Sequence, residues 1–383
     1  MYSLTDEQRL IFSECRRIAT EEFAPRAFTW DDEPPTENVE LLADLELVGL
    51  NYPIELGGGG LSEFEVCLQI EAIGRICPDT AQSVYRRSMI APRVIEMFGS
   101  ESLKEEYITD VTAGERSISV AISEPQAGSD VQNIGTQLVE DGDGYLLTGE
   151  KTWITQGESA DSLVVWTRLP DSNMGVVVVD TDQAGVARET DYTNMAGDTQ
   201  THFTFSEVSV PESHVVVSGK SGFKRMLRAL NWERCASAMG CIAIALCAFD
   251  TAVEYAKTRE QFGQSISEFQ GLRWKFADMA MQIQLGRTMV YNTVITAVEN
   301  ECPPNRLQSS IAALYATEVC NNVVDEALQI HGANGYQQGH PLEYLYRLVR
   351  GKRIAAGTDE MLRNTIADAV LDEGLADLPD LMN

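Results

Sequence analysis

The feature that most constrains the fold is a change in hydrophobic periodicity along the chain. Apolar residues recur at helical spacing up to about residue 115 and again from Gly222 onwards. Between Ser117 and about Ser218 they alternate with polar residues, and turn residues separate the runs, which is typical of β-strands. Helices, then strands, then helices predict segregated layers and argue against a doubly wound sheet. The expected fold class is therefore a multi-domain protein with α and β parts.

Individual helices follow from the same spacing. Thr5, followed by Asp6 and Glu7, is expected to cap the first helix. The glycine run 57–60 is expected to be a turn, because it lacks the Gly-Lys-Ser/Thr ending of a phosphate-binding loop. The longer helices are expected over Glu63–Ile76, Asp79–Phe98, 222–258, 266–300, 305–332 and 341–350, with a last helix after Thr358.

Length and composition exclude several classes of protein. A chain of 383 residues can hold two or three domains with a sizeable core. We find no unbroken apolar run of about 18 residues, so no membrane insertion is expected. The polar, acidic N-terminus is unlike a secretory or organellar signal. Eight cysteines without a Cys-x-x-Cys pair, and only four histidines, argue against disulfides and a metal site and favour a cytoplasmic location.

The net charge of −29 makes nucleic acid and anionic membranes poor partners, because both need basic patches. Arginine outnumbers lysine among the few cationic residues. Two explanations stay open: adaptation to high salt, where an acidic and lysine-poor surface stays hydrated, or an ordinary acidic bacterial enzyme. In either case an anionic substrate would need local positive potential.

The stretch from Ala121 to Gly157 is the first candidate binding site. Its first half places the hydroxyls of Ser123 and Ser129 in a loop with small residues, which let backbone N–H groups approach a ligand closely. Its second half places Trp153 among strand-forming residues. A polar cradle beside an aromatic plate suits a flat, hydrogen-bonding ring system. The alternative is an ordinary β-hairpin around the Asp143-Gly144 turn.

Both halves, in this order and spacing, resemble the flavin-binding segment of the acyl-CoA dehydrogenases. Three further motifs match that family in the same order: Arg259-Glu-Gln-Phe-Gly263 followed by Phe269-Gln270, Gln329-Ile-His-Gly332, and Gly357-Thr-Asp-Glu360. The resemblance implies an N-terminal all-α domain (1–116), a central β-barrel or sandwich domain (117–220) and a C-terminal four-helix bundle (221–383). It also implies FAD as cofactor, an acyl-CoA thioester as substrate and an electron-transferring flavoprotein as electron acceptor.

The resemblance further implies which residues contact FAD. Contacts within one subunit are expected from Ile122, Ser123, Gly128, Ser129, Trp153, Ile154 and Thr155. Contacts across a subunit boundary are expected from Arg259, Gln261, Phe262, Phe269, Gln270, Gln329, Ile330, His331, Gly332 and Ala333, and Thr358 and Glu360 are also expected at the cofactor. We expect His331 to pack against the cofactor or the core and not to act as an acid or base. Flavin sites shared between subunits imply a homo-oligomer, here a homotetramer.

In this family a carboxylate takes the α-proton while the β-hydrogen passes as hydride to flavin N5, giving a trans-2-enoyl-CoA. Many members carry this base in a Tyr-Glu-Gly-Thr segment, where the present chain reads Ala355-Ala356-Gly357-Thr358. Members of the isovaleryl-CoA dehydrogenase and crotonobetainyl-CoA reductase type also have Ala-Gly-Thr there, and their base directly precedes an arginine on an earlier helix. Glu233, before Arg234, resembles that base. The alternative is a carboxylate paired on a solvated helix face.

The remaining expected contacts concern the substrate. The backbone N–H of Ala356 is expected to stabilise the thioester oxygen, because a backbone donor survives a change of side chain. Ser129, Asn231, Arg234 and Gly357 are expected at the thioester arm or beside the base. Counting back from Gly99 places Arg86 near the bottom of the acyl pocket in the family. It could meet a carboxylate or another polar acyl tail, or it could face solvent or pair with acidic neighbours.

Three functions follow from this resemblance. The leading one is an FAD-dependent acyl-CoA dehydrogenase of fatty acid metabolism. The second is an enoyl-CoA reductase, which runs the same flavin reaction in reverse. The third is a non-catalytic protein that binds flavin or CoA, which the missing glutamate at position 356 keeps open.

Overall fold

The computed structural model describes residues 3–29 and 35–375. The chain forms two compact units. The helical unit comprises Met1–Trp30, Glu63–Gln82 and Glu233–Asn383. The sheet unit comprises Asp31–Ser62 and Ser83–Trp232. Two helices, α4 (Pro78–Met89) and α7 (Gly222–Thr258), belong partly to each unit.

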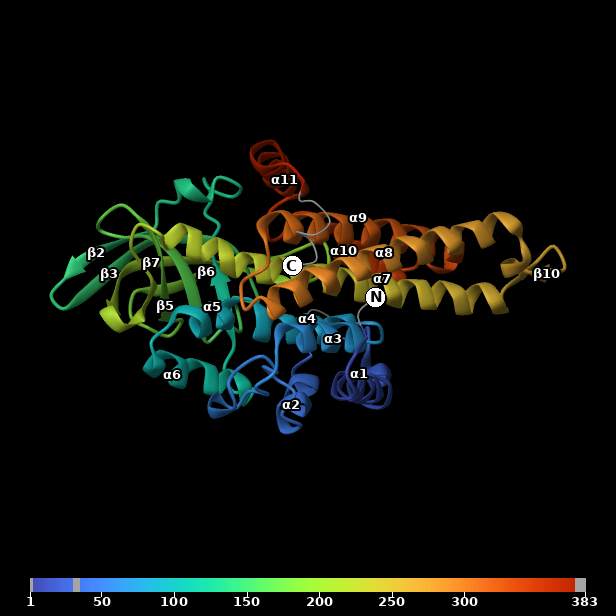
Figure 1. Ribbon diagram of the computed structural model, residues 1–383, viewed down its shortest axis with the longest axis horizontal. Coiled ribbons are helices and arrows are strands. Elements are labelled where there is room, and N and C mark those ends of the chain that lie inside the picture. Colours follow the sequence, from blue (N-terminus) through green and yellow to red (C-terminus); the bar gives the residue numbers. More distant parts are fainter. Residues whose placement is uncertain (1–2, 30–34, 376–383) are drawn as a thin grey trace. The chain divides into compact units, whose positions relative to one another are not determined.

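The helical unit is built around α9, which packs against α8, α10 and α11 (Figure 1). Thr5 accepts a hydrogen bond from the backbone of Gln8, whose side chain accepts one from the backbone of Thr5, so α1 begins with a capping box as expected. Every residue of α3 is buried, as in a helix that lies in the interior. The complete helices of this unit are α1 (Asp6–Ile18), α3 (Glu63–Gly74), α8 (Gln270–Glu299), α9 (Arg306–His331), α10 (Pro341–Lys352) and α11 (Asp359–Glu373).

Ion pairs cross-link the helices of this unit. The carboxylate of Glu71 on α3 is fully buried and accepts two hydrogen bonds from Arg287 on α8, at 2.7 and 2.5 Å. The Tyr291 hydroxyl donates to the same carboxylate at 2.9 Å. Arg75 forms a second forked pair with Asp250 on α7. Forked arginine–carboxylate pairs fix geometry as well as distance, so they set how these helices pack.

The sheet unit contains one eight-stranded sheet with the order β6-β7-β3-β2-β4-β5-β8, and β1 pairs in parallel with β4. Most other neighbours are antiparallel, as expected for segregated strands. The strands are β1 (Ile118–Ala121), β2 (Gln137–Asp141), β3 (Gly144–Thr155), β4 (Ser162–Arg168), β5 (Met174–Asp180), β6 (Val186–Thr193), β7 (Thr199–Pro211) and β8 (Val215–Val217).

Strand β4 is buried on both faces. Leu163 and Val165 pack into one core with residues of β3 and β7. Val164 and Trp166 point to the opposite face and pack into a second core with α5 (Ala91–Phe98) and α6 (Glu101–Thr112), which lie beside the sheet in Figure 1. Burial on both faces explains why β4 reads as a continuous apolar run instead of an alternating one.

Two expected helices differ from those observed. The single helix over Asp79–Phe98 is wrong: α4 ends at Met89, Ile90 leaves the helical region at φ −113° and ψ −112°, and α5 begins at Ala91. Pro92, in the first turn of α5, lacks the N–H that a continuous helix would need. The stretch 266–300 is also interrupted, because Ile266–Glu268 forms a 3₁₀ turn before α8 begins. The domain boundaries proposed from the sequence stay predictions.

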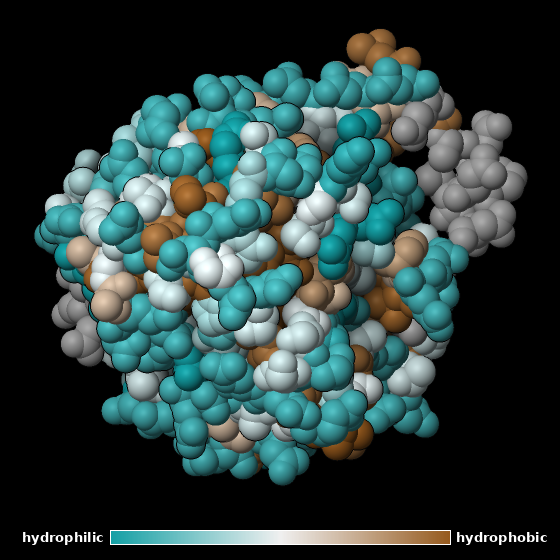
Figure 2. All heavy atoms as spheres, turned by 90° about the vertical axis from the view of Figure 1, so that its left-hand side faces the viewer, coloured by the Kyte–Doolittle hydropathy of each residue, from teal (hydrophilic) through white to brown (hydrophobic). Residues whose placement is uncertain are grey.

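One apolar run was overlooked in the sequence. Within α7 there is an 18-residue window with mean hydropathy 1.8, long and apolar enough to cross a membrane by composition. Because 72% of that window is buried, the run also fits the core helix of a globular protein. Figure 2 shows one face of the molecule, on which hydrophilic side chains predominate and hydrophobic ones occur in small groups.

Candidate active site

The two halves of the expected flavin segment are neighbours in the sheet unit. The backbone N–H of Thr152 on β3 donates to the carbonyl of Ser123 at 2.9 Å. The hydroxyl of Ser119 donates to the carbonyl of Thr155 at 3.0 Å. The loop after β1 is therefore tied along the strand that carries Trp153, as the sequence motif requires.

A buried ion pair, missed by the sequence analysis, holds this loop. Lys151 Nζ lies 2.8 Å from Glu124 Oε1 and donates to the carbonyl of Ile122, also at 2.8 Å. The Glu124 carboxylate also accepts from the backbone N–H groups of Gly135 and Thr136, at 2.5 and 3.0 Å. Both side chains of the pair are almost completely buried. Strand alternation gives the missing signal, because position 151 lies on the same strand face as buried Leu147.

Burial and hydrogen bonds shift the pKa values of this pair in opposite directions. Burial lowers the pKa of Lys151 to about 8. Burial alone would raise the pKa of Glu124, but hydrogen bonds from Lys151, Thr136 and Gly135 outweigh it and bring the pKa below its ordinary value. Both groups are therefore charged at neutral pH, and the carboxylate is stabilised by the donors that fix the loop.

Trp153 is turned outward at an irregularity in β3. The β3–β7 register shifts between Lys151 and Ile154, and Trp153 has a left-handed φ of 61°. Its side chain is 53% exposed, and its ring lies 4.8 Å from that of Tyr192 on β6. A bulge that re-aims one aromatic side chain is a common device next to binding sites. Tyr192, which no motif indicated, extends the aromatic plate.

In the helical unit, the expected base and its neighbours occupy α7. Glu233 is partly buried, and burial raises the pKa of its carboxyl to about 7, against the opposing charge of Arg234. Arg234 is buried, and its Nη1 donates to Ser310 on α9 at 3.4 Å. A carboxyl whose pKa lies near the working pH is suited to take and return a proton.

The turn between α10 and α11 brings a backbone donor to the same unit. Ala356 has a left-handed φ of 54°, which is uncommon for a residue with a side chain. Among the residues that the structure describes, the N–H of Ala356 has no hydrogen-bond acceptor. A Cβ built on Gly357 would lie 3.7 Å from Nη2 of Arg234, so this turn and the Glu233–Arg234 step are close. The structure thus brings Arg234 close to the turn that carries Ala356 and Gly357.

The two motifs expected at a subunit boundary also meet in the helical unit. Tyr255 on α7 stacks on His331 at 4.1 Å, its hydroxyl accepts from Asn334 at 2.8 Å, and its carbonyl accepts from the N–H of Arg259 at 2.9 Å. Tyr255 therefore joins the Arg259–Gly263 motif to the Gln329–Gly332 motif. His331 is buried, with Nδ1 2.8 Å from the carbonyl of Ala327, and burial lowers its pKa.

The side chains of these motifs are mostly exposed in the single chain. Strands β9 (Glu260–Gln261) and β10 (Gln264–Ser265) form a hairpin with Phe262 at its tip, 95% exposed. Thr358 caps α11 by accepting from the N–H of Met361 at 3.3 Å, which also gives it a structural role. The other exposed members are Arg259, Gln261, Gln270, Gln329, Gly332, Ala333 and Glu360, whereas Ile330 is buried and Phe269 is partly buried.

Comparison with known proteins decides the family. Models of the N-terminal, middle and C-terminal domains of acyl-CoA dehydrogenase match residues 5–115, 119–208 and 220–371. The chain belongs to the acyl-CoA dehydrogenase family. Members of this family are FAD-dependent oxidoreductases that act on the CH–CH bond of acyl-CoA thioesters.

Relatives of this acyl-CoA dehydrogenase family member cover almost its whole length. A 3-sulfinopropanoyl-CoA desulfinase of Paraburkholderia xenovorans (strain LB400) is 34% identical over 387 residues, covering 98% of this chain and 99% of the relative. The probable acyl-CoA dehydrogenase YngJ of Bacillus subtilis (strain 168) is 32% identical and covers 97% and 99%. The structure of butyryl-CoA dehydrogenase from Megasphaera elsdenii matches with a TM-score of 0.91 at 26% identity, covering 97% of this chain and 100% of that chain.

The residues expected to hold FAD in this acyl-CoA dehydrogenase fold fit a flat, polar ligand. No atom lies within 4 Å of a Cβ built on Gly128, so the loop beside Ser129 leaves open space. Both residues are exposed, and Ser123 and Thr155 are partly buried beside them. Exposed Trp153 supplies an apolar surface that a ring could cover. Among the described residues, no cluster of histidine, cysteine or carboxylate side chains could hold a metal ion.

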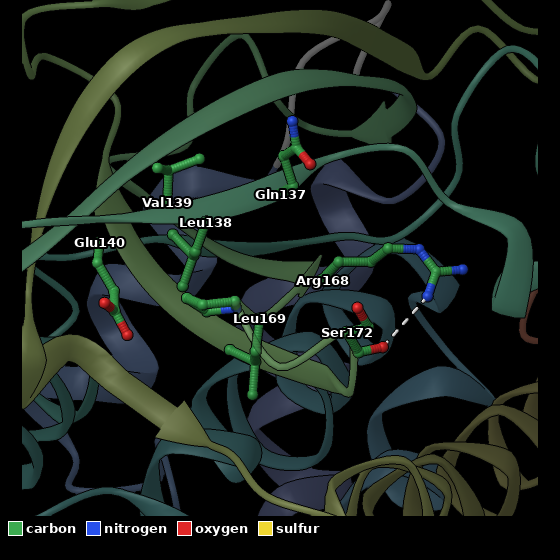
Figure 3. A pocket seen from close by; sticks show the side chains of 8 residues that line it. Gln137, Leu138, Val139, Glu140, Arg168, Leu169 and Ser172 are labelled. Atoms are coloured by element: carbon green, nitrogen blue, oxygen red, sulfur yellow. Dashed lines mark hydrogen bonds between the residues drawn. The ribbon is translucent and has the colours of Figure 1, made fainter.

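A separate groove of about 530 Å³ opens beside β2 and the turn after β4 and contains none of the expected site residues (Figure 3). It lies where β2 diverges from the turn after β4. Arg168, one of its lining residues, uses its guanidinium on carbonyl groups of the same unit, at 2.9 Å for Ile134 and 3.4 Å for Ser172. Because these carbonyl groups already occupy the charged guanidinium of Arg168, we do not assign the active site to this groove. It is lined by Gln137, Leu138, Val139, Glu140, Arg168, Leu169, Pro170 and Ser172.

Proposed function

We propose that this family member is an acyl-CoA dehydrogenase in which Glu233 removes the α-proton of an acyl-CoA thioester, giving a trans-2-enoyl-CoA. The observation that carries the proposal is the Glu233 carboxyl, whose pKa burial raises to about 7 in a chain that lacks a carboxylate at position 356. An ordinary surface glutamate would be fully ionised and strongly hydrated at neutral pH. A partly desolvated carboxylate is a stronger base toward a weakly acidic C–H bond.

The N–H of Ala356 is the proposed donor to the thioester oxygen. Loss of the α-proton places negative charge on that oxygen, and a donor already aimed at it lowers the barrier without reorganisation. The left-handed φ of Ala356 and the nearby Arg234 guanidinium support this role, because they hold the backbone of the turn and add positive charge. Glu233 and Ala356 would then act on adjacent atoms of one thioester.

FAD, when bound, accepts the β-hydrogen together with two electrons. The protein's part is to hold the ring and keep water from it. We assign the ring contacts to Trp153 and Thr155 and the polar contacts to Ser123, Gly128 and Ser129. The Glu124–Lys151 pair supports these contacts by fixing the loop that carries them.

We further propose a cytoplasmic homotetramer that shares its FAD sites between subunits and passes electrons to an electron-transferring flavoprotein. Exposed Arg259 and Phe262 support the shared sites, because Tyr255 joins the start of their motif to the Gln329–Gly332 motif and both side chains are left open in the single chain. A chain from a structure described as "Electron transferring flavoprotein of Acidaminococcus fermentans: Towards a mechanism of flavin-based electron bifurcation" matches with a TM-score of 0.92 at 28% identity, which supports the electron acceptor.

The reverse reaction is the alternative, because one relative is an acryloyl-CoA reductase (NADH) of Anaerotignum propionicum, 31% identical over 380 residues. Anaerobic mixing of the holoenzyme with a panel of thioesters separates a protein that catalyses this flavin reaction, in whichever direction, from one that only binds FAD. The panel contains straight, branched, cyclic and dicarboxylic acyl-CoAs and 3-sulfinopropanoyl-CoA. Bleaching of oxidised flavin by a saturated acyl-CoA supports the dehydrogenase, and a protein that binds FAD but is bleached by none of them contradicts it.

A further inference from the structure

Strand β2 has a strand partner along its whole length on one side only. It pairs with β3 over all five of its residues, from Gln137 to Asp141. On the other side it meets β4 at a single position, where Gln137 lies beside Arg168, the last residue of β4. Strand β2 therefore continues past the end of β4. Among the strand pairs of the described residues, none involves this edge beyond Gln137.

The direction of the backbone groups shows which of them this edge leaves open. The N–H of Arg168 donates to the carbonyl of Thr136 at 2.9 Å, so the backbone of Thr136 faces β4. Successive residues of a strand direct their backbone groups to opposite sides, so those of Leu138 and Glu140 face the same way as those of Thr136. The carbonyl of Leu138 and both backbone groups of Glu140 are therefore directed away from β3, into the space beyond the end of β4.

The groove beside this edge has room for an added strand (Figure 3). Its volume of about 530 Å³ lies within the range of about 300–1,000 Å³ that is typical of ligand sites. One wall of the groove is β2, and the other is the turn 169–172. Val139 on β2 is 52% exposed. An open row of backbone groups beside an exposed apolar side chain is a template for strand addition.

The charges around the groove indicate what can occupy it. Glu140 and Arg168 are the charged residues among those that line it. The guanidinium of Arg168 already donates to three backbone carbonyls, whereas the Glu140 side chain has no partner among the described residues. Exposed carboxylates lie at both ends of the groove, Asp141 and Asp143 at the hairpin and Asp171 in the turn. The edge is therefore negative, and its single cation is used within the fold.

This charge makes a second copy of the chain a poor occupant. If the β2 edges of two copies paired, Glu140 and Asp141 of one chain would lie beside the same carboxylates of the other. Charged side chains on an edge strand commonly prevent such self-association. Lysine or arginine side chains on an added strand would instead be attracted to these carboxylates while its backbone pairs with β2.

We propose that the β2 edge binds an extended, cationic segment of a partner protein, which adds as a strand beside Leu138 and Glu140 and fills the groove. Backbone pairing supplies the direction and register of the segment, and the carboxylates select its charge. This docking surface lies within the sheet unit and goes beyond the proposed catalytic function.

The test uses a fluorescein-labelled hexapeptide of alternating lysine and valine, titrated into the FAD-loaded protein at low salt while fluorescence anisotropy is recorded. A matched peptide with glutamate in place of lysine is expected to bind about tenfold more weakly or worse, because like charges then meet. A fully N-methylated lysine–valine peptide keeps the charges but lacks backbone donors, and we expect a loss of about tenfold or more for it as well.

The variant Glu140→Pro tests the backbone of the protein. It removes an N–H that faces the groove and points away from β3, so the β2–β3 ladder is expected to persist. Affinity for the lysine–valine peptide should fall by about tenfold or more, and Glu140→Gln, which removes only the charge, should lose less. Glu115→Gln, an exposed carboxyl of the same unit, is the control and should bind as the native protein does. Unchanged melting and flavin absorbance show that each variant is folded.

Three outcomes would overturn the inference. Equal binding of the plain and N-methylated peptides would mean attraction by surface charge alone. No binding of any peptide at low salt would mean that the groove holds only solvent. A native oligomer that dissociates in Glu140→Pro, as measured by light scattering, would mean that a second copy occupies the edge. Because no step needs turnover, the result is independent of the proposed function.

Discussion

Two pairs of opposite charge in the sheet unit, Lys151 with Glu124 and Arg86 with Glu158, differ in how their hydrogen-bonding capacity is used. Lys151 and Glu124 lie 2.8 Å apart, and each is bonded to backbone groups as well. Arg86 Nε and Glu158 Oε2 are buried and reach no partner among the described residues. The first pair fixes a loop, while the second leaves one buried hydrogen-bonding atom of each side chain unused by the described residues.

The comparison extends to the carboxyl group of Glu233. Burial is the largest cause acting on the pKa of Glu124, Glu158 and Glu233 alike. The pKa of Glu124 nevertheless falls, because several donors stabilise its charged form, whereas the pKa values of Glu158 and Glu233 rise. The number of hydrogen-bond donors therefore separates Glu124 from the other two carboxyl groups more clearly than burial does.

The largest effect is expected from Glu233→Gln. Removing a positioned base should slow flavin reduction by about a hundred- to ten-thousand-fold while FAD and acyl-CoA still bind. Stopped-flow bleaching of the flavin measures the rate, and Glu254→Gln, on the exposed part of the same helix, is the control. The double variant Glu233→Gly with Ala356→Glu, which moves the carboxylate to position 356, should recover part of the rate. A Glu233→Gln enzyme that bleaches at nearly the native rate would contradict the proposed base.

Breaking the Lys151–Glu124 pair is expected to lower both the stability of the fold and the affinity for FAD. Lys151→Met leaves the Glu124 carboxylate buried without its charge partner, which typically destabilises a protein by about 3–5 kcal/mol. Thermal unfolding and FAD titration measure the two losses. The double variant Lys151→Met with Glu124→Met is expected to regain stability but not FAD affinity, because the bond to the Ile122 carbonyl is still missing. Full FAD affinity in the double variant would show that the pair serves stability alone.

Arg259→Ala addresses the proposed subunit boundary. The side chain is exposed in the single chain, so its removal should leave the helical unit folded. If Arg259 contacts FAD bound to a neighbouring subunit, FAD affinity should fall by roughly tenfold or more, because a charged hydrogen bond to a phosphate is lost. FAD titration and light scattering measure the two quantities. A monomer with full FAD occupancy would contradict both the shared site and the tetramer.

The sequence predicts the helices and strands better than it predicts the hydrogen-bond partners of their polar groups. Periodicity indicates the strands and most helices, because the pattern of burial is local. The break at Ile90 was missed, since Pro92 is tolerated in a first helical turn and the apolar spacing continues through it. Lys151 received no role in the sequence analysis, because lysine is rarely buried. Tyr255, which joins two motifs, carries no motif of its own, and its role depends on tertiary contacts.

The pKa of Glu233 is raised and that of Glu124 is lowered, so their contributions to stability change with pH in opposite directions. Flavin reduction should increase as the pH rises through about 7, because only the ionised carboxylate accepts a proton. Stability should change in the reverse direction: between the ordinary pKa of 4.5 and about 7 the folded state binds the proton more tightly, so this contribution declines as the pH rises. Glu233→Gln should flatten both profiles. Unchanged profiles would mean that another group titrates in this range.

The smallest effect is expected from an ion pair that matches the first one in distance but not in burial. Lys257 Nζ lies 2.7 Å from Glu254 Oε1 on α7, nearly the separation of Lys151 and Glu124, but the two side chains are 59% and 72% exposed. Water screens the exposed charges and hydrates either one alone, so Lys257→Met should change the free energy of unfolding by less than about 1 kcal/mol. Calorimetric melting of Lys257→Met beside Lys151→Met makes the comparison under one set of conditions. Equal shifts for the two variants would mean that distance, and not desolvation and donor count, sets the strength of these pairs.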